Sequence, residues 1–280
     1  MPGWLNIHAS VDRLRADWLT RRPSAPCESA FAAPPPPQVK NLEKDMKSAC
    51  PKIRKLGASA GVCVKDGETV AFMGDSITQQ GNMTPAGYVN LVMKGLEVAG
   101  VKGAKKIAAG ISGQRSTHMN ARLDKDILQK RPEWMTFSCG VNDVWHGRGG
   151  VPLEQYKKLV TDIFDRAAAS NVNVIVLTPT VIGENLENAE NAKLAGYVAW
   201  LKEEAVRRKL RLADLNADIQ AEIRRIRAAE PGRKGFLVTS DGVHMAFPGD
   251  CVMAWGVLRA MGVEESMKEK VFAAFRRVPQ

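Results

Sequence analysis

Two short motifs near opposite ends of the chain carry residue types that can act as a nucleophile and its base. Gly74–Ser76 follows an apolar run, so the hydroxyl of Ser76 is expected at the mouth of a buried strand. Asp241–His244 lies close to the C-terminus. An acid three residues before a histidine can orient the imidazole, which can then take the proton of a serine hydroxyl. Together the motifs predict nucleophilic catalysis by Ser76, with His244 as base and Asp241 as its orienting acid.

Each motif also has an ordinary structural interpretation. Asp75 and Ser76 could simply cap a helix, because both residue types accept hydrogen bonds from first-turn amides. The Asp-Gly pair at Asp241 favours a turn, in which His244 would be incidental. The catalytic interpretation therefore depends on the two motifs occurring together and in this order.

Two further residues are candidates for stabilising a developing oxyanion. Gly113 follows a second apolar run, and the backbone N–H of a glycine can approach a substrate oxygen without an intervening Cβ. Asn142 follows a third run, in Gly140–Asp143, and its amide could donate to the same oxygen. The alternatives are an ordinary turn glycine and an Asx-turn.

Residues Gly57–Gly61 match the GxSxG pattern of another class of serine hydrolases. That pattern requires a buried strand before the serine and a helix after it. The preceding segment Lys52–Leu56 is too charged for a buried strand, and Val62–Asp66 does not have a helical pattern. We interpret Gly57–Gly61 as a loop of small residues.

Short apolar runs that alternate with helical periodicity predict the elements that position these motifs. The predicted strands are Thr69–Met73, Lys105–Ala109, Trp134–Cys139, Val172–Thr178 and Leu210–Leu215. The predicted helices are Pro85–Ala99, Arg115–Gln129, Pro152–Ser170, Leu186–Lys209, Ala217–Ala229, Pro248–Met261 and Glu264–Arg277. Strands that alternate with helices favour right-handed crossovers and a three-layer α/β/α sandwich around a parallel five-stranded sheet.

This fold places the candidate residues together. Ligands bind beyond the carboxyl ends of the strands in such sheets. Ser76, Gly113 and Asn142 each follow a different predicted strand. We therefore expect all three at the same edge of the sheet.

Residues 1–66 differ in composition from the rest and are predicted to be a basic N-terminal extension, poorly ordered or with short helices. Pro34–Pro37 favours an extended spacer. The segment contains 11 Lys and Arg against 6 Asp and Glu, so it carries +5 of the net charge of +10. Aromatic residues make up only 6% and do not interleave with basic runs, so no specific nucleic-acid partner is predicted. Residues 67–280 are predicted to form the catalytic domain.

Composition and residue spacing also bear on whether the protein spans a membrane, is secreted, binds a metal or contains a disulfide. Apolar residues make up 45% and no run approaches the roughly 18 that a membrane span needs. Charged residues at 13–22 interrupt any signal-peptide pattern, so a cytoplasmic location is the default expectation, or secretion if the true start lies elsewhere. The histidines lack metal-ligand spacing, and no metal or cofactor is predicted. Cys139 and Cys251 are expected to be buried thiols, whereas pairing of Cys50 with Cys63 stays open.

These four blocks together resemble the GDSL/SGNH hydrolase superfamily. Its pattern is a Ser in Gly-Asp-Ser, a Gly, an Asn in Gly-x-Asn-Asp, and a terminal Asp-x-x-His, here Ser76, Gly113, Asn142 and Asp241 with His244. The resemblance covers about residues 67–262. It implies a flavodoxin-like sandwich and ester hydrolysis through an acyl-serine, with an oxyanion hole formed by the N–H groups of Ser76 and Gly113 and by the Asn142 side chain. Many members continue His-Pro, whereas here the proline is delayed to Pro248.

The expected substrate is a short-chain acyl ester, with O-acetyl esters of carbohydrates favoured. The expected rim carries polar side chains that suit a polar acceptor, and the candidate pocket residues are Asp75, Gln114, Trp145, His146 and Met245. A lysophospholipase or thioesterase acting on longer chains is the alternative enzyme. The alternative of another class is a non-catalytic carbohydrate- or surface-binding module with a retained fold. The sequence does not predict the oligomeric state.

Overall fold

The computed structural model describes residues 61–279 of the chain. Most of the predicted N-terminal extension, Cys50 and residues 57–60 of the GxSxG match lie outside the described residues. Residues 61–66 are part of the description and already contact the domain. Val64 is buried, and the N–H of Cys63 donates to the carbonyl of Met261 at 2.7 Å. The division of the chain at residue 66 stays a prediction.

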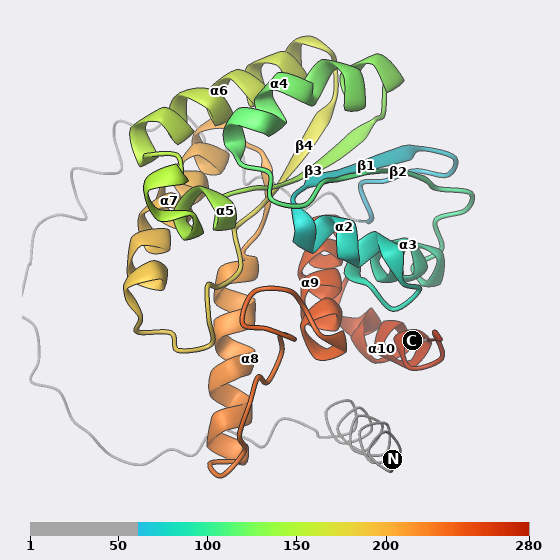
Figure 1. The fold of residues 1–280 in the computed structure, drawn as a ribbon. Helices are drawn as coiled ribbons and strands as arrows, with labels where there is room; N and C mark the ends of the chain where they lie inside the picture. Colours follow the sequence, from blue (N-terminus) through green and yellow to red (C-terminus); the bar gives the residue numbers. More distant parts are fainter. Residues whose placement is uncertain (1–60, 280) are drawn as a thin grey trace, which may run out of the picture. The chain divides into compact units, whose positions relative to one another are not determined.

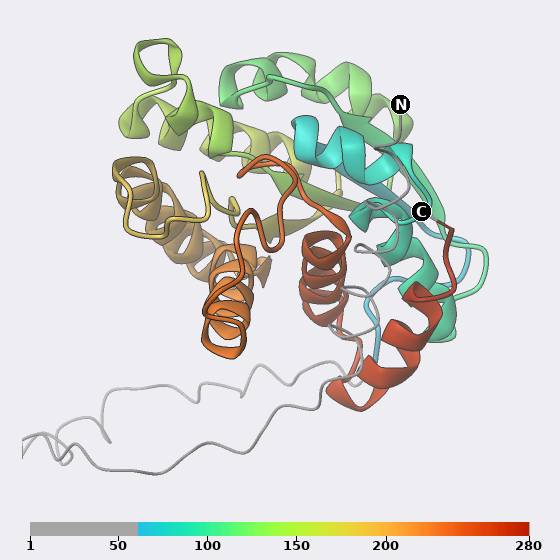
Figure 2. The same cartoon turned by 60° about the horizontal axis from the view of Figure 1, so that its bottom comes forward.

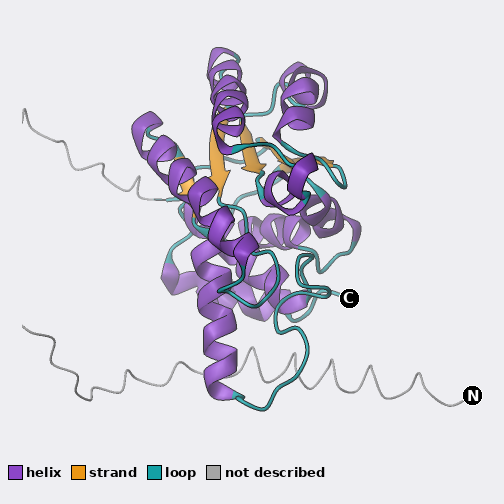
Figure 3. Ribbon diagram, turned by 60° about the vertical axis from the view of Figure 1, so that its left-hand side comes forward, coloured by secondary structure: helices purple, strands orange, loops and turns teal. Residues whose placement is uncertain are grey.

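Five parallel strands form one sheet in the order β2-β1-β3-β4-β5. The strands are β1 (Thr69–Gly74), β2 (Lys105–Gly110), β3 (Trp134–Ser138), β4 (Asn173–Leu177) and β5 (Arg211–Ala213). The predicted α/β fold with a parallel five-stranded sheet is confirmed, and Figure 3 shows the strands enclosed between helices.

The burial of each strand follows its place in the sheet. The central strands β1, β3 and β4 are buried at every position after the first. Their apolar and β-branched residues face helices on both sides, as a central parallel strand requires. The edge strand β2 instead exposes Lys105 and Lys106, and charged residues on an edge oppose pairing with another chain.

Helices cover both faces of the sheet, as Figure 1 shows with α4 and α6 on one side and α3 and α9 on the other. An aromatic pair marks the core on each face: Phe137 of β3 contacts Phe164 of α6, and Phe72 of β1 contacts Tyr88 of α3. The helices of eight or more residues are α2 (Ser76–Met83), α3 (Tyr88–Val98), α4 (Ser116–Asp126), α6 (Leu153–Ala169), α7 (Ala189–Arg208), α8 (Leu215–Ala229), α9 (Phe247–Ala260) and α10 (Lys268–Phe275). The shorter ones are α5 (Val141–Trp145), η2 (Leu128–Lys130), η3 (Gly147–Gly149) and η4 (Glu265–Met267).

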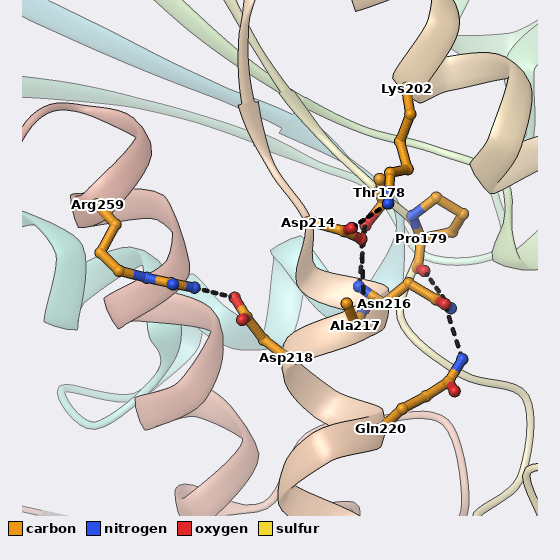
Figure 4. Close-up of polar contacts among 9 residues, drawn as sticks. All are labelled: Thr178, Pro179, Lys202, Asp214, Asn216, Ala217, Asp218, Gln220 and Arg259. Atoms are coloured by element: carbon orange, nitrogen blue, oxygen red, sulfur yellow. Dashed lines mark hydrogen bonds and ion pairs between the residues drawn. The ribbon is translucent and has the colours of Figure 1, made fainter. Parts of the chain in front are cut away.

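Polar contacts join the end of β4 to the start of α8 (Figure 4). The Asp214 carboxylate accepts from the Thr178 hydroxyl at 3.1 Å and from the N–H of Ala217 at 3.3 Å, and Lys202 pairs with it. The Asn216 amide donates to the carbonyl of Pro179 at 3.1 Å. This anchor fixes α8, which leads into the long loop before α9. That loop, coloured orange in Figure 2, carries Asp241 and His244.

The described region contains three of the five cysteines. Cys139 and Cys251 are buried, as predicted, and Cys63 is partly exposed. Among residues 61–279, no helix is both long and apolar enough to cross a membrane.

Candidate active site

Ser76 lies at the junction of β1 and α2, where it is the first residue of the helix and 6% exposed. Gly74 makes this tight junction possible, because a Cβ on Gly74 would lie 2.0 Å from the hydroxyl oxygen of Thr78. The Asp75 carboxylate accepts from the N–H of Ile77 at 2.9 Å and caps α2. The capping and the catalytic interpretations of this motif are thus compatible, since the cap fixes the start of the helix that presents Ser76.

A continuous chain of hydrogen bonds links the two distant motifs. The Nε2 atom of His244 lies 2.8 Å from the Oγ of Ser76. On the opposite side of the ring, Nδ1 of His244 lies 2.6 Å from Oδ2 of Asp241. The other oxygen of Asp241 accepts the backbone N–H groups of Val243 at 2.9 Å and His244 at 2.8 Å. Both carboxylate oxygens are therefore used to hold the imidazole and its backbone.

These bonds keep Asp241 ionised. Partial burial by itself raises the pKa of a carboxyl group, but here the bond from the His244 ring and the two backbone N–H groups outweigh it. The pKa of Asp241 is consequently lowered. A negative Asp241 favours the tautomer of His244 that carries its proton on Nδ1, which leaves Nε2 free to accept from Ser76.

Three N–H donors are candidates for an oxyanion hole. In the described part of the chain, the backbone N–H groups of Ser76 and Gly113 donate to no protein acceptor. The side-chain amide of Asn142, itself 4% exposed, donates one hydrogen to the carbonyl of Gln114 at 3.1 Å. Gly113 has φ +72°, a left-handed conformation that favours glycine.

Asp143 connects the segments that carry two of these donors, Gly113 and Asn142. The sequence did not predict this role. Asp143 is fully buried, and its carboxylate accepts both the N–H of Ser116 at 3.0 Å and the Ser116 hydroxyl. Asp143 follows Asn142 on α5, and Ser116 begins α4 just after the Gly113 turn. Burial raises the pKa of Asp143, although the Ser116 bonds oppose that shift. The Gly-x-Asn-Asp motif includes Asp143. Nothing in the sequence around Asp143, however, indicates that Ser116 is its hydrogen-bond partner.

The predicted pocket residues divide into two groups. Trp145 is 46% exposed and His146 is exposed beside it, with ring centroids 6.2 Å apart. Met245 is half-buried, directly after His244.

The remaining two predicted pocket residues make contacts within the protein, and their part in a substrate pocket stays a prediction. Gln114 is half-buried, and its side-chain oxygen accepts from Arg122. Asp75 is 2% exposed, and burial raises its pKa to about 6.

Within residues 61–279, no three His, Cys, Asp or Glu side chains form a set that could hold a metal ion. The side chains that can act as nucleophile, base and orienting acid are Ser76, His244 and Asp241, at the carboxyl edge of a parallel sheet. A serine bonded to an imidazole that is bonded to a carboxylate, inside an α/β/α sandwich, defines the class of serine hydrolases.

Comparison with known proteins narrows this class. The chain belongs to the GDSL-like lipase/acylhydrolase family, whose model matches residues 72–246. It is accordingly a carboxylic ester hydrolase. Among curated proteins it resembles an acetylxylan esterase from Geobacillus stearothermophilus, with 25% identity over 220 residues, 72% of this chain and 97% of the relative.

Solved structures agree with the fold. The acetyl xylan esterase AlAXEase is 28% identical, with a TM-score of 0.63 over 69% of this chain and 98% of its own. Axe2, an acetylxylan esterase from Geobacillus stearothermophilus, is 23% identical with a TM-score of 0.63 over 72% and 97%. LAE5, an alpha/beta hydrolase enzyme from the metagenome of Lake Arreo in Spain, is 24% identical with a TM-score of 0.62 over 72% and 98%.

Proposed function

We propose that the protein is a serine esterase that removes short acyl groups, above all O-acetyl groups of carbohydrates, through an acyl-serine intermediate. The observation that carries this proposal is the chain of bonds from Ser76 through His244 to Asp241, at 2.8 and 2.6 Å. In this scheme Ser76 is the nucleophile, His244 the general base and Asp241 the acid that orients it.

The reaction proceeds in two halves. Nε2 of His244 takes the proton of the Ser76 hydroxyl as Oγ attacks the ester carbonyl. The imidazolium then gives that proton to the departing alcohol, and the acyl group remains on Oγ. In the second half His244 takes a proton from water, whose oxygen attacks the acyl-serine. Collapse of this second intermediate releases the carboxylic acid and returns the proton to Ser76.

Charge on the carbonyl oxygen needs donors already in place. We assign this role to the N–H of Ser76, the N–H of Gly113 and the amide of Asn142. First-turn amides of a helix have no intrahelical acceptor, so the N–H of Ser76 is available to the substrate. Such fixed donors stabilise the transition state more than the ground state, because the negative charge develops only as the tetrahedral intermediate forms.

The acetyl-carbohydrate assignment has two supports. Relatives with comparable fold and almost complete coverage are named acetylxylan esterases. Axe2 has also been solved as three catalytic mutants, in each of which one residue is replaced by alanine. The replaced residues are a serine, an aspartate and a histidine, and the histidine lies three positions after the aspartate. The same residue types and spacing occur here at Ser76, Asp241 and His244. Exposed Trp145 and His146 offer an aromatic and a polar surface to a sugar acceptor.

We place this activity in residues 67–280 and regard residues 1–66 as a separate basic extension. The proposed catalytic and oxyanion residues all lie in the hydrolase part. The extension contributes charge but none of these side chains.

Replacement of the nucleophile tests the function. Ser76→Ala should lower acetate release from acetylated xylooligosaccharides by several orders of magnitude with the fold retained, because no hydroxyl remains to be acylated. A phosphonate probe should label the wild-type protein at Ser76, as mapped by mass spectrometry. Ser112→Ala, which removes an exposed hydroxyl on the neighbouring loop, is the matched control and should retain activity.

Other outcomes would redirect the assignment. Preferential release of long fatty acids by the wild-type protein would favour a lysophospholipase or thioesterase. Sugar binding with neither turnover nor probe labelling would indicate a non-catalytic binding module. Near-normal turnover by Ser76→Ala would refute the nucleophile.

A further inference from the structure

Glu184 carries a buried carboxylate outside the catalytic motifs. It lies in the loop between β4 and α7 and is 5% exposed. Its oxygen Oε2 accepts the N–H of Leu237 at 2.7 Å. Its oxygen Oε1 accepts the N–H of Val238 at 2.9 Å, the N–H of Thr239 at 2.9 Å and the Thr239 hydroxyl at 2.8 Å. Three consecutive backbone amides and one hydroxyl therefore converge on a single carboxylate.

We propose that Glu184 is a positioning residue that holds the Asp241–His244 turn in its working geometry. The inference rests on the catalytic roles proposed above for Asp241 and His244. Charge-assisted hydrogen bonds of this kind are about twice as strong as those between neutral groups. They fix the segment that enters the turn only two residues before Asp241.

We call Glu184 and the four hydrogen bonds that its carboxylate accepts the clamp. The clamp reaches the Asp241–His244 turn through Thr239. The Thr239 hydroxyl donates to Glu184 and accepts the N–H of Gly242 at 3.1 Å. The carbonyl of Gly242 accepts the N–H of Gly183 at 2.7 Å. Both polar backbone groups of Gly242 are thus held by the Glu184 loop, one directly and one through Thr239. Gly242 lies between Asp241 and His244, so its position sets where both side chains begin.

The Glu184 loop is itself firmly held. The side chain of Asn191, on α7, accepts the N–H of Ile182 and donates to the carbonyls of Ile182, Gly183 and Asn185. Arg227 of α8 donates to the carbonyl of Glu184. The clamp therefore transmits the position of two helices to the catalytic turn.

A turn without regular structure needs such an anchor. The segment from Glu230 to Ala246 contains one isolated bridge, Thr239 to Met245, and otherwise no helix or strand. Restricting this loop keeps Nε2 of His244 within reach of Ser76. Displacement of a reacting group by about 1 Å can cost about a hundredfold in rate.

Glu184→Gln is the principal test, measured as kcat and KM on an acetyl ester and as the rate of phosphonate labelling of Ser76. Glutamine keeps the size of the side chain, but its NH₂ group would face an N–H donor, either that of Leu237 or those at Oε1. We expect kcat and labelling to fall about tenfold to a hundredfold, with KM within about twofold, because the defect lies in alignment of the base. Glu204→Gln is the matched control: Glu204 is an equally buried glutamate on α7 that pairs with Arg207 and Arg208. It should turn over like the wild-type protein.

Thr239→Val gives a second route that does not alter the charge. It preserves side-chain shape but removes the relay to Gly242, so kcat should fall with KM unchanged. In the double variant the two losses should be less than multiplicative, because both changes interrupt one chain of contacts. If Glu184→Gln does not fold, Thr239→Val decides the question alone.

The possible outcomes separate the inference from the proposed function. Wild-type protein that labels at Ser76, together with Glu184→Gln and Thr239→Val variants that match Glu204→Gln, overturns the clamp alone. A rise in KM with unchanged kcat also overturns it. Wild-type protein that neither labels nor turns over removes the proposed function, and the clamp with it.

Discussion

At the scale of single residues, we assign different acceptors to the two hydrogens of the Asn142 side-chain amide. One hydrogen of its amide is used by the carbonyl of Gln114 at 3.1 Å, which fixes the orientation of the side chain. The second hydrogen is the one we assign to the substrate oxygen. Asn142→Ala should therefore lower kcat on an acetyl ester by about 10²–10³-fold, the usual cost of losing one oxyanion donor. Steady-state kinetics of the purified variant measures this directly.

Asn120→Ala serves as the control for Asn142→Ala. The amide of Asn120 donates to the carbonyl of Leu159 and to the Asp162 carboxylate, and these bonds join α4 to α6. It should affect stability more than kcat. A loss of less than tenfold in Asn142→Ala would reduce Asn142 to a turn residue that supports the Gln114 carbonyl.

The sequence indicates the candidate catalytic residues more readily than the residues that we propose to support them. Ser76 and the Asp241–His244 pair were predicted because residue type and local spacing are readable, and the structure brings them within hydrogen-bond distance. Glu184 accepts bonds from residues 53–55 positions away, and no local pattern marks a partner at that separation. Tertiary packing decides whether such a glutamate is buried. The hydrophobic periodicity of a single sequence carries no information about that packing.

At the scale of elements, α9 is joined to α3 by the half-buried acid Asp250. The carboxyl group of Asp250 accepts the N–H of Tyr88 at 2.8 Å, and the Tyr88 hydroxyl in turn lies 2.8 Å from that of Thr78 on α2. Burial raises the pKa of Asp250 to about 7 from its ordinary value of 3.8, although the Tyr88 N–H opposes the shift. Ionisation of this group in the folded protein is therefore costly.

The sign of the pH effect follows from these values. Between pH 3.8 and about 7 the folded protein keeps a proton on Asp250 that the unfolded chain has lost, so this group's contribution to stability declines as the pH rises. Asp250→Asn can still accept from Tyr88 and avoids the charge. It should unfold with a free energy higher than the wild type by on the order of 1–3 kcal/mol near pH 8, and about equal near pH 4.

Urea unfolding at the two pH values measures the difference between Asp250→Asn and the wild-type protein. Glu203→Gln, which removes an exposed acid on α7, should follow the wild-type pH dependence and serves as the control. If Asp250→Asn is less stable than the wild type at both pH values, the charge of Asp250 is a benefit to the folded state.

The elements themselves were predicted unevenly. All five strands were placed correctly, because their apolar runs are short and bounded by polar loops. The helices α2 and α5 were missed: α2 contains Gly81 and Thr78, weak helix formers, and α5 has only five residues. The order β2-β1-β3-β4-β5 depends on which strands pair at long range, and that information is not contained in the period of any one segment.

At the scale of the whole molecule, positive charge is distributed unevenly along the chain. Residues 1–60 hold 10 Lys and Arg against 5 Asp and Glu, half of the net charge of +10. The proposed catalytic residues lie after them. We therefore expect the chemistry and any electrostatic attraction to an acidic surface to be separable properties of the protein.

Removal of residues 1–60 should leave kcat on an acetyl ester within about twofold and weaken binding to an acidic polysaccharide, with a flatter dependence on salt, because fewer cations displace counterions. The truncation is made at residue 60 because Val64 is buried and Cys63 bonds to Met261. A full-length variant with Arg13, Arg15, Arg21 and Arg22 changed to Gln keeps the length and lowers the charge by four. If charge is responsible, this variant should lie between the wild type and the truncation. An identical salt response in all three proteins would place the attraction on the hydrolase surface instead, where Arg207, Arg208 and Lys209 are the first residues to neutralise.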